Sequence, residues 1–280
     1  MGFKEKLALK YVRTKFQILS FFSKRNAAEA AFELFCTPQF RNTKELPSVF
    51  AKAEVINFHF HNYHIQGYRW NKEGIKKIQI LHGFESSVVN FDHFVQLLID
   101  KDYCVLAFDA PAHGRSSGKS TNVMMYKEFI EYIFKEYGPV TNYICHSLGG
   151  LSVSLAMEST PHNESFKIAL IAPATETPTA IDNFFQFLHL NNKVRKEFDK
   201  IIEQKSNHKP EWFSVVRALQ HIKAQVLWIH DKDDDMTPLR DAEKIKQYAL
   251  PNVELVITEG LGHRRIYRDK EVVKRIIDFF

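Results

Sequence analysis

Apolar and polar residues alternate in two neighbouring stretches, AEVINFHF (53–60) and YHIQGYRW (63–70). Such period-two alternation is typical of strands that bury one face. Because the two stretches follow each other closely, we expect a pair of antiparallel strands at the start of a sheet.

Four short apolar runs follow, and stretches with helical periodicity separate them. The runs expected as strands are IQIL (78–81), YCVLAF (103–108), VTNYIC (140–145) and KIALIA (167–172). Helices are expected at about 88–101, 121–137 and 148–159. This alternation of strand and helix predicts a mostly parallel sheet with helices on both faces.

The alternation stops after Pro173 and resumes about fifty residues later. Residues 174–222 have helical periodicity but contain no convincing strand. Further strands are then expected at AQVLWIH (224–230) and VELVI (253–257), with a last helix from about 269. We interpret 174–222 as a helical cap, inserted after the sixth strand and placed over the carboxyl edge of the sheet, where parallel sheets bind ligands.

Composition and cysteine content fit a globular protein with one large α/β domain. The chain has 280 residues, of which 45% are hydrophobic and 25% charged. Its three cysteines, Cys36, Cys104 and Cys145, have no metal-binding spacing. A disulfide framework is therefore not expected, and a reducing, cytoplasmic location is the default prediction.

The positive charge is concentrated in the first 27 residues. This segment holds seven lysines and arginines against the single acidic residue Glu5, a net charge of +6, whereas the whole chain carries +5. The rest of the chain is thus close to neutral, which disfavours a nucleic-acid-binding protein. Apolar residues at helical spacing, Leu7, Tyr11, Phe16 and Leu19 among them, predict that a helix in this segment has an apolar face.

Two interpretations of the basic segment remain open. The favoured one is a helical segment, residues 1–50, that packs on the core of an α/β domain formed by residues 51–280. The other is a helix that lies on an anionic membrane surface as a peripheral contact. Charges interrupt every apolar run, so we expect neither a signal peptide nor a membrane-spanning helix.

The sequence CHSLGG (145–150) lies between an expected strand and an expected helix. A serine on such a sharp turn, in the pattern G-x-S-x-G, is typical of a catalytic nucleophile. Here Cys145 replaces the first glycine, but cysteine is small and apolar, so the motif is loosened without being broken. Ser147 is therefore the candidate nucleophile, whereas Cys145 is expected to be buried and poorly ionised.

Partners for this serine follow other expected strands. Gly83 in LHGFE (81–85) allows a sharp turn, so the N–H groups of Phe84 and Leu148 are candidate oxyanion donors. His263 in GLGHRRI (260–266) is the candidate base. The acid lies in IHDKDDDMTP (229–238), where the residues alone leave four aspartates open. The chain order Ser, Asp, His is that of the α/β-hydrolase triad.

From about residue 50 to 280 the chain resembles the serine α/β-hydrolases of the esterase, lipase and proline-iminopeptidase-like group. The resemblance rests on HGF (82–84), DAPAHGRSSG (109–118), CHSLGG (145–150), HDKDDDMTP (230–238) and GLGH (260–263). HDKDDDMTP resembles the pattern H-G-x-x-D-x-x-V-P, which implies that Asp234 is the acid and that Asp231 replaces a glycine. Asp109 and His113 are expected to shape a loop.

The resemblance implies a serine hydrolase that needs no cofactor and no metal. We expect it to cleave a carboxylic ester of a small apolar substrate through an acyl-enzyme. Phe184 and Phe185 are candidate substrate-binding residues, with the alternative that they form the core of the cap itself. An aminopeptidase or amidase, and a non-catalytic binding protein of the same fold, remain open. Dehalogenase and epoxide-hydrolase chemistry is disfavoured, because those relatives have aspartate in place of Ser147.

Overall fold

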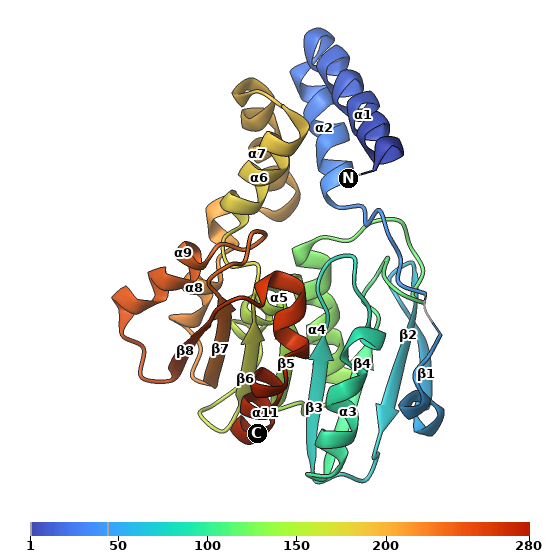
Figure 1. Cartoon of the computed structure of the whole chain (residues 1–280), viewed down its shortest axis with the longest axis vertical. Coiled ribbons are helices and arrows are strands. Elements are labelled where there is room, and N and C mark those ends of the chain that lie inside the picture. Colours follow the sequence, from blue (N-terminus) through green and yellow to red (C-terminus); the bar gives the residue numbers. More distant parts are fainter. Residues whose placement is uncertain (1, 44) are drawn as a thin grey trace. The chain divides into compact units, whose positions relative to one another are not determined.

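The computed structural model describes residues 2–43 and 45–280, and the chain divides into two compact units (Figure 1). The sheet unit comprises Pro38–Thr175 and Ser214–Phe280. The helical unit comprises Met1–Thr37 and Glu176–Phe213. Each unit therefore consists of two segments that are far apart in the sequence.

The sheet unit is built on eight strands in the order β1-β2-β4-β3-β5-β6-β7-β8. The pairs β1–β2 and β2–β4 are antiparallel and all the other pairs are parallel. The strands are β1 (Glu54–Phe60), β2 (Tyr63–Trp70), β3 (Lys76–Leu81), β4 (Tyr103–Phe108), β5 (Asn142–His146), β6 (Lys167–Ile171), β7 (Gln225–Asp231) and β8 (Val253–Thr258). The predicted mostly parallel sheet and its opening hairpin are confirmed.

Burial explains why the central strands have continuous apolar sequences. Every residue of β4 and β5 is buried, because helices cover both faces of this part of the sheet. β1 lies at the sheet edge, and its outward-facing residues are exposed. Its hairpin with β2 pairs Phe60 with Tyr63, and His61 in the two-residue turn has a φ of 49°. This left-handed backbone is typical of tight hairpins.

One layer of helices covers each face of the sheet (Figure 1). On one face α3 packs beside α11, and on the other α4 and α8 pack against α5. The helices of this unit are α3 (Asp92–Ile99), α4 (Val123–Tyr137), α5 (Leu148–Met157), α8 (Val215–Leu219), α9 (Leu239–Ala242), α10 (Gly262–Arg265) and α11 (Lys270–Phe279).

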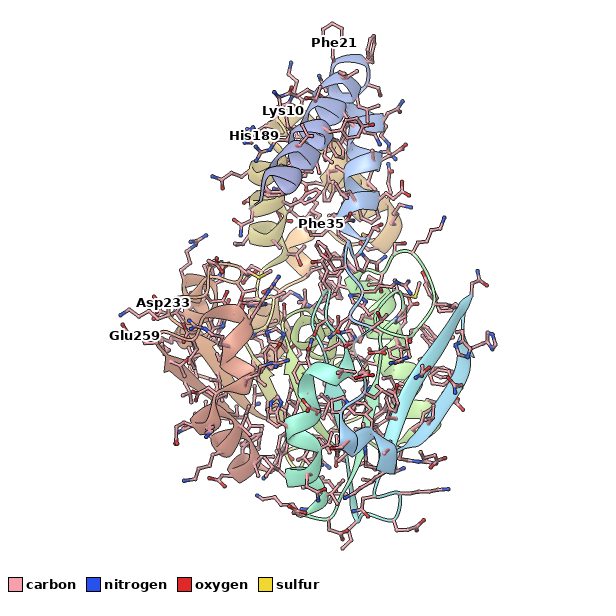
Figure 2. The ribbon with its side chains drawn as sticks, turned by 45° about the vertical axis from the view of Figure 1, so that its right-hand side comes forward. Lys10, Phe21, Phe35, His189, Asp233 and Glu259 are labelled. Atoms are coloured by element: carbon pink, nitrogen blue, oxygen red, sulfur yellow. The ribbon has the colours of Figure 1, made fainter. Side chains whose placement is uncertain are left out.

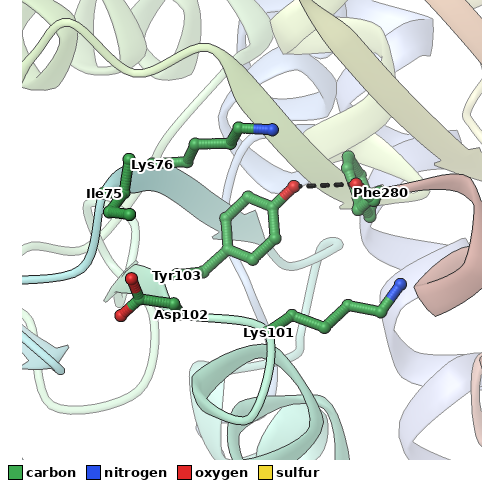
Figure 3. A pocket seen from close by; sticks show the side chains of 6 residues that line it. All are labelled: Ile75, Lys76, Lys101, Asp102, Tyr103 and Phe280. Atoms are coloured by element: carbon green, nitrogen blue, oxygen red, sulfur yellow. Dashed lines mark hydrogen bonds between the residues drawn. The ribbon is translucent and has the colours of Figure 1, made fainter.

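The last helix is anchored at the amino ends of the parallel strands. The Tyr103 hydroxyl donates to the Phe280 carbonyl at 3.0 Å, beside a shallow cavity lined by Ile75, Lys76, Lys101, Asp102, Tyr103 and Phe280 (Figure 3). Lys167 Nζ donates to the Phe279 carbonyl at 2.6 Å. Cations at the C-terminal end of a helix complement its dipole, so these contacts stabilise α11. This edge lies opposite the carboxyl edge, where the predicted chemistry lies.

The helical unit joins the start of the chain to the insertion that follows β6. Its helices are α1 (Phe3–Phe22), α2 (Lys24–Phe35), α6 (Thr177–Leu188) and α7 (Asn192–Ser206). Ala27, Ala28 and Ala31 are fully buried on α2, and such small side chains allow α2 and α7 to approach closely. The ring of Phe198 on α7 lies 5.8 Å from those of Phe32 and Phe35.

This grouping differs from the expected division at residue 50. Residues 1–37 belong with 176–213, and only the following segment lies on the sheet unit, where Phe50 packs against Tyr68 and Trp70. The physical reason is that the apolar face of α2 finds its partner on α7. The insertion after β6 is present as expected, but α8 packs on α5 in the sheet unit, so the inserted helices end near residue 213 and not near 222. The position of these helices over the carboxyl edge stays a prediction.

The expected apolar face of α1 also needs correction. Phe16 is buried, whereas Leu7 and Tyr11 are exposed on the other side of the helix. These residues therefore do not share a face. None of the described helices is both long and apolar enough to cross a lipid bilayer.

Candidate active site

Three sequence-predicted residues lie together at the carboxyl edge of the sheet. Ser147 follows β5, Asp234 follows β7, and His263 lies in α10 after β8. Because β5, β7 and β8 run in the same direction, their carboxyl ends meet at one edge. In the chain, Ser147 and Asp234 are 87 residues apart and Asp234 and His263 are 29 residues apart, so the fold brings together side chains from distant segments.

Ser147 lies on a strained turn between β5 and α5. Its φ of 52° and ψ of −119° fall in a region that residues other than glycine rarely adopt. The turn is tight because α5 begins at once and passes close to the end of β3. A Cβ atom on Gly149 would lie 2.7 Å from the Leu81 carbonyl oxygen, so only glycine fits there. This is the strand-to-helix elbow expected for a nucleophilic serine.

Cys145 occupies the position where the motif usually has glycine. The residue is fully buried in β5, where it pairs with Leu81 on one side and Leu170 on the other. Burial raises the pKa of the Cys145 thiol well above its usual value. The thiol is therefore protonated at neutral pH, and Cys145 acts as a small apolar residue.

His263 connects the serine to an aspartate. Its Nε2 lies 3.0 Å from Ser147 Oγ, and its Nδ1 lies 2.8 Å from Asp234 Oδ2. A carboxylate accepts hydrogen bonds only, so the proton on the imidazole is at Nδ1. Nε2 is then free to accept the proton of the Ser147 hydroxyl. This is the geometry of a nucleophile, a base and an orienting acid.

The structure brings Asp234 to His263 and holds it as a carboxylate. Oδ1 accepts from the N–H groups of Met236 and Thr237 at 2.9 and 2.8 Å, and Oδ2 accepts from Thr237 Oγ1 at 2.8 Å. Burial tends to raise the pKa of Asp234, but the hydrogen bonds of His263 and Thr237 outweigh it and the pKa is lowered. Thr237 lies in the same DDDMTP stretch as Asp234, but no pattern in the sequence indicates its role.

Asp231 has a structural role that the sequence did not reveal. Its carboxylate accepts from Thr258 Oγ1 at 2.7 Å and from the N–H groups of Gly262 and Leu261 at 2.8 and 3.2 Å. The side chain is buried, and it ties the end of β7 to the loop that leads into His263. Burial tends to raise the pKa of Asp231, yet these hydrogen bonds lower it. Asp231 therefore helps to position His263, and it does so from the place where the family pattern has glycine.

Two buried histidines support the same region. His146 Nε2 donates to the His263 carbonyl at 3.0 Å, and His230 Nε2 donates to the Thr237 carbonyl at 2.6 Å. Burial lowers the pKa of both, that of His146 to about 3. They are thus neutral at physiological pH and add no positive charge beside His263.

The two candidate oxyanion donors lie next to Ser147. Leu148 is the first residue of α5, and a Cβ atom on Gly83 would lie 2.8 Å from Ser147 Cβ, which places the Gly83–Phe84 peptide against the serine. Between residues 45 and 280, neither the Phe84 N–H nor the Leu148 N–H donates to a protein acceptor. Such free backbone donors beside a nucleophile are what an oxyanion requires.

A second pair of histidines fixes the loop that contains Phe84. His82 Nδ1 donates to the Gly83 carbonyl at 2.8 Å, while its Nε2 accepts from the Ala110 N–H at 3.0 Å. The Gly83 carbonyl and the Phe84 N–H belong to one peptide and point in opposite directions. His82 thereby turns the Phe84 N–H away from itself. His113 Nε2 accepts from the Glu85 N–H at 3.0 Å, so this loop is held on both sides of Phe84.

Neutral histidines are required at these positions, which makes the fold sensitive to acid. Burial lowers the pKa of His82 and His146 to about 3 and that of His113 to about 4. In the unfolded chain they titrate near 6.5, so unfolding takes up protons and stability falls as the pH drops from about 6.5 toward 4. Asp109 partly offsets this, because burial raises its pKa to about 6 and the folded state binds its proton first.

We therefore expect the free energy of unfolding to fall by roughly 3 kcal/mol per pH unit near pH 5, which corresponds to about two protons taken up on unfolding. Urea titrations between pH 7.5 and 4.5 measure this slope. His113→Asn removes one titrating group and should flatten it, while the same change at the exposed His189 serves as the control. A slope that is unchanged by His113→Asn would contradict this origin of the acid sensitivity.

The aromatic residues predicted to bind substrate pack inside the helical unit. Phe185 is buried, and its ring lies 5.2 Å from that of Phe198. Phe184 is half-buried, and its ring lies 5.1 Å from that of Phe35. These contacts support the alternative in which the aromatics form the core of the helical unit. Substrate contact by Phe184 or Phe185 stays a prediction.

Among the residues that the structure describes, no group of three or more His, Cys, Asp or Glu side chains is arranged to hold a metal ion. The hairpin residues His59 and His64 have their rings 5.6 Å apart, in an edge contact. The candidate catalytic groups at the carboxyl edge are the hydroxyl of Ser147, the imidazole of His263, the carboxylate of Asp234 and the backbone N–H groups of Phe84 and Leu148.

Comparison with known proteins gives the same fold. The uncharacterized protein YqkD of Bacillus subtilis (strain 168) is 23% identical over 243 residues, which cover 79% of this chain and 76% of YqkD. The Pyrococcus furiosus esterase Pf2001 has a TM-score of 0.64 at 20% identity and covers 87% of this chain and 96% of its own.

Two further solved structures match at similar levels. Mouse alpha/beta hydrolase domain-containing protein 10 has a TM-score of 0.61 at 17% identity, over 81% of this chain and 96% of its own. A bacterial membrane phospholipase A has a TM-score of 0.61 at 18% identity, over 99% of this chain and 97% of its own. These likenesses confirm the predicted α/β-hydrolase fold.

The family model described as serine aminopeptidase, S33, matches residues 73–214, about half of the chain. This span includes Ser147, Phe84 and Leu148 but ends before Asp234 and His263. Together with the eight-stranded sheet and its elbow at Ser147, the match shows that the chain belongs to the serine aminopeptidase S33 family of α/β hydrolases.

Proposed function

We propose that the protein is a serine hydrolase that cleaves a carboxylic ester of an apolar acyl group through an acyl-enzyme. The observation that carries this proposal is the hydrogen-bonded series from Ser147 Oγ through His263 to Asp234 Oδ2. A serine hydroxyl is a weak nucleophile unless a base takes its proton, and this series supplies the base and the group that orients it. The esterase and the phospholipase among the structural neighbours also support ester cleavage.

In the first half of the reaction, Ser147 Oγ bonds to the ester carbonyl carbon as its proton passes to His263 Nε2. The carbonyl oxygen becomes an oxyanion, which accepts from the N–H groups of Phe84 and Leu148. When the carbonyl re-forms, the bond to the alcohol oxygen breaks, and His263 donates its proton to that oxygen. Asp234 stabilises the imidazolium that exists between these two transfers.

In the second half, water replaces the alcohol. His263 Nε2 takes a proton from the water while the water oxygen bonds to the acyl carbon. The second oxyanion then collapses, the bond to Ser147 Oγ breaks, and the serine regains its proton from His263. The products are a carboxylic acid and free enzyme, so the cycle needs no cofactor.

An aminopeptidase is the second candidate, because the family model carries that description. Such enzymes need an acidic group to hold the free amino group of the substrate. The sequence offers Glu176 and Asp182 for this purpose, but the carboxylate of Asp182 forms an ion pair with Arg195, which also bonds to Asp199 at 2.8 Å. This engagement of Asp182 favours the ester over the peptide.

Matched substrates distinguish the two candidates. We expect p-nitrophenyl butyrate to be hydrolysed at a rate well above that of butyryl p-nitroanilide and leucyl p-nitroanilide, as measured by kcat/KM. Among p-nitrophenyl esters, kcat/KM should rise from acetate toward longer chains by up to about fourfold per methylene, since each buried methylene is worth about 0.8 kcal/mol. Faster cleavage of leucyl p-nitroanilide than of every ester would favour the aminopeptidase instead.

A further inference from the structure

The outer side of α1 carries large apolar side chains that the helical unit does not cover. Phe21 and Phe22 are 82% and 80% exposed, and Tyr11, Leu7 and Ile18 are 72%, 60% and 54% exposed. Figure 2 shows Phe21 at the end of α1, with its ring pointing away from the neighbouring helices. Soluble monomers rarely expose a continuous apolar patch, and such patches mark interaction surfaces.

These residues form a stripe along the helix. At 100° per residue, Leu7, Tyr11, Ile18 and Phe22 fall within an arc of about 60°, and Phe21 lies about 40° to one side of Leu7. The stripe extends roughly 23 Å at 1.5 Å per residue. Phe16, which is buried, lies on the opposite side of α1. The helix therefore has one apolar face inside the unit and a second one in solvent.

Lysines flank the exposed stripe on both sides. Lys10 lies beside Phe21 and Lys15 beside Phe22 on the helical circumference, and both are exposed. Arg13 lies nearer the inner face, where it donates to the Phe187 carbonyl at 2.7 and 2.9 Å. The first 27 residues carry a net charge of +6 in a chain whose total is +5. The uncovered apolar stripe thus has an exposed lysine on each side and lies in the segment of the chain that carries the excess positive charge.

We propose that α1 docks the protein on an anionic lipid surface, with the apolar stripe of Leu7, Tyr11, Ile18, Phe21 and Phe22 inserted at the level of the headgroups. An apolar face with basic residues at its borders is the arrangement that binds such an interface, because the lysines reach the lipid phosphates while the rings enter the acyl region. Docking does not depend on the proposed reaction.

The charge argues against a second copy of the chain as the occupant. In a two-fold symmetric dimer the same surface patch contacts itself. Lys10 and Lys15, which border the stripe, would then lie near the same lysines of the second copy, and like charges repel strongly where water is excluded. An anionic surface instead attracts each lysine near it.

Vesicle flotation with the full chain tests the proposal. We expect binding to phosphatidylglycerol vesicles at least tenfold tighter than binding to phosphatidylcholine vesicles, and a loss of binding in 0.5 M NaCl. The double variant Phe21→Ser/Phe22→Ser and the double variant Lys10→Glu/Lys15→Glu should each weaken phosphatidylglycerol binding at least tenfold. Because these side chains are exposed, both variants should keep the wild-type melting temperature.

Phe40→Ser/Ile75→Ser is the matched control, since it removes two apolar side chains from the sheet unit that are 73% and 85% exposed. It should bind vesicles like the wild type. Unchanged binding by either α1 variant, or equal affinity for both lipids, would overturn the proposal. So would a wild-type dimer in sedimentation equilibrium that Phe21→Ser/Phe22→Ser converts to a monomer. Hydrolysis of a soluble ester, measured on the same variants, tests the proposed function separately.

Discussion

Ser147→Ala is expected to abolish ester hydrolysis, with a fall in kcat of about 10⁵–10⁶-fold, as the loss of a triad nucleophile causes in other serine hydrolases. The variant retains His263 and both candidate oxyanion donors, but it lacks the hydroxyl that lies against His263 Nε2. The nearby Cys145 cannot substitute, because its buried thiol is protonated and lies in the strand before the turn. Labelling by a fluorophosphonate should disappear together with the activity.

Ser152→Ala provides the control for this experiment. Ser152 is buried five residues further along, in α5, so its change tests the same helix without touching the elbow. It should keep both labelling and turnover. Labelling of Ser147→Ala at the wild-type rate would show that the nucleophile is a different residue, and the proposed function would then fail.

Asp234→Asn is expected to lower kcat by roughly 10³–10⁴-fold, as loss of the carboxylate that sets the histidine tautomer does elsewhere. The asparagine amide group would donate toward His263 Nδ1 and favour a proton on Nε2, where it blocks proton transfer from Ser147. Asp233→Asn and Asp235→Asn are matched controls in the same loop, because both side chains are exposed. Each should lose about tenfold at most.

Asp231 differs from Asp234, which contacts His263, and also from the exposed Asp233 and Asp235. Asp231→Asn would place an amide against the N–H groups of Leu261 and Gly262, which now donate to a carboxylate. We expect a lower melting temperature and a kcat loss between those of the Asp234 and Asp235 variants, since His263 would shift with its loop. If Asp235→Asn were the most damaged of the four in steady-state assays, the assignment of Asp234 would be wrong.

Local patterns made the sheet unit predictable. The hairpin follows from alternation in β1 and β2, and the buried strands β4 and β5 from continuous apolar runs between helical stretches. The spacing from His230 to Pro238 resembles a known pattern, and that resemblance identified Asp234 among four neighbouring aspartates. The position of Ser147 followed from the glycines after it, and the close passage of α5 by the end of β3 requires the glycine at 149.

Contacts between segments that are distant in the sequence could not be predicted from such local patterns. The apolar side of α2 is visible in the sequence, but nothing in it indicates that its partner is α7 and not the sheet. The role of the Asp231 carboxylate could not be predicted either. It accepts hydrogen bonds from the backbone N–H groups of Leu261 and Gly262, and such groups do not depend on which side chains the residues carry. The sequence also grouped Leu7 and Tyr11 with Phe16, although the helix turns them to opposite sides.

The helical unit is made of two segments that are far apart in the sequence, and this determines the order in which it can assemble. During synthesis α1 and α2 are made before the sheet, whereas α6 and α7 follow only after β3, β4, β5 and β6 have been made. Until α6 and α7 are translated, α2 lacks the rings of Phe184 and Phe198 that pack against its Phe32 and Phe35. Although α1 and α2 are made before the sheet, they are therefore among the last elements to complete their packing, and a chaperone or a protease would meet them unprotected.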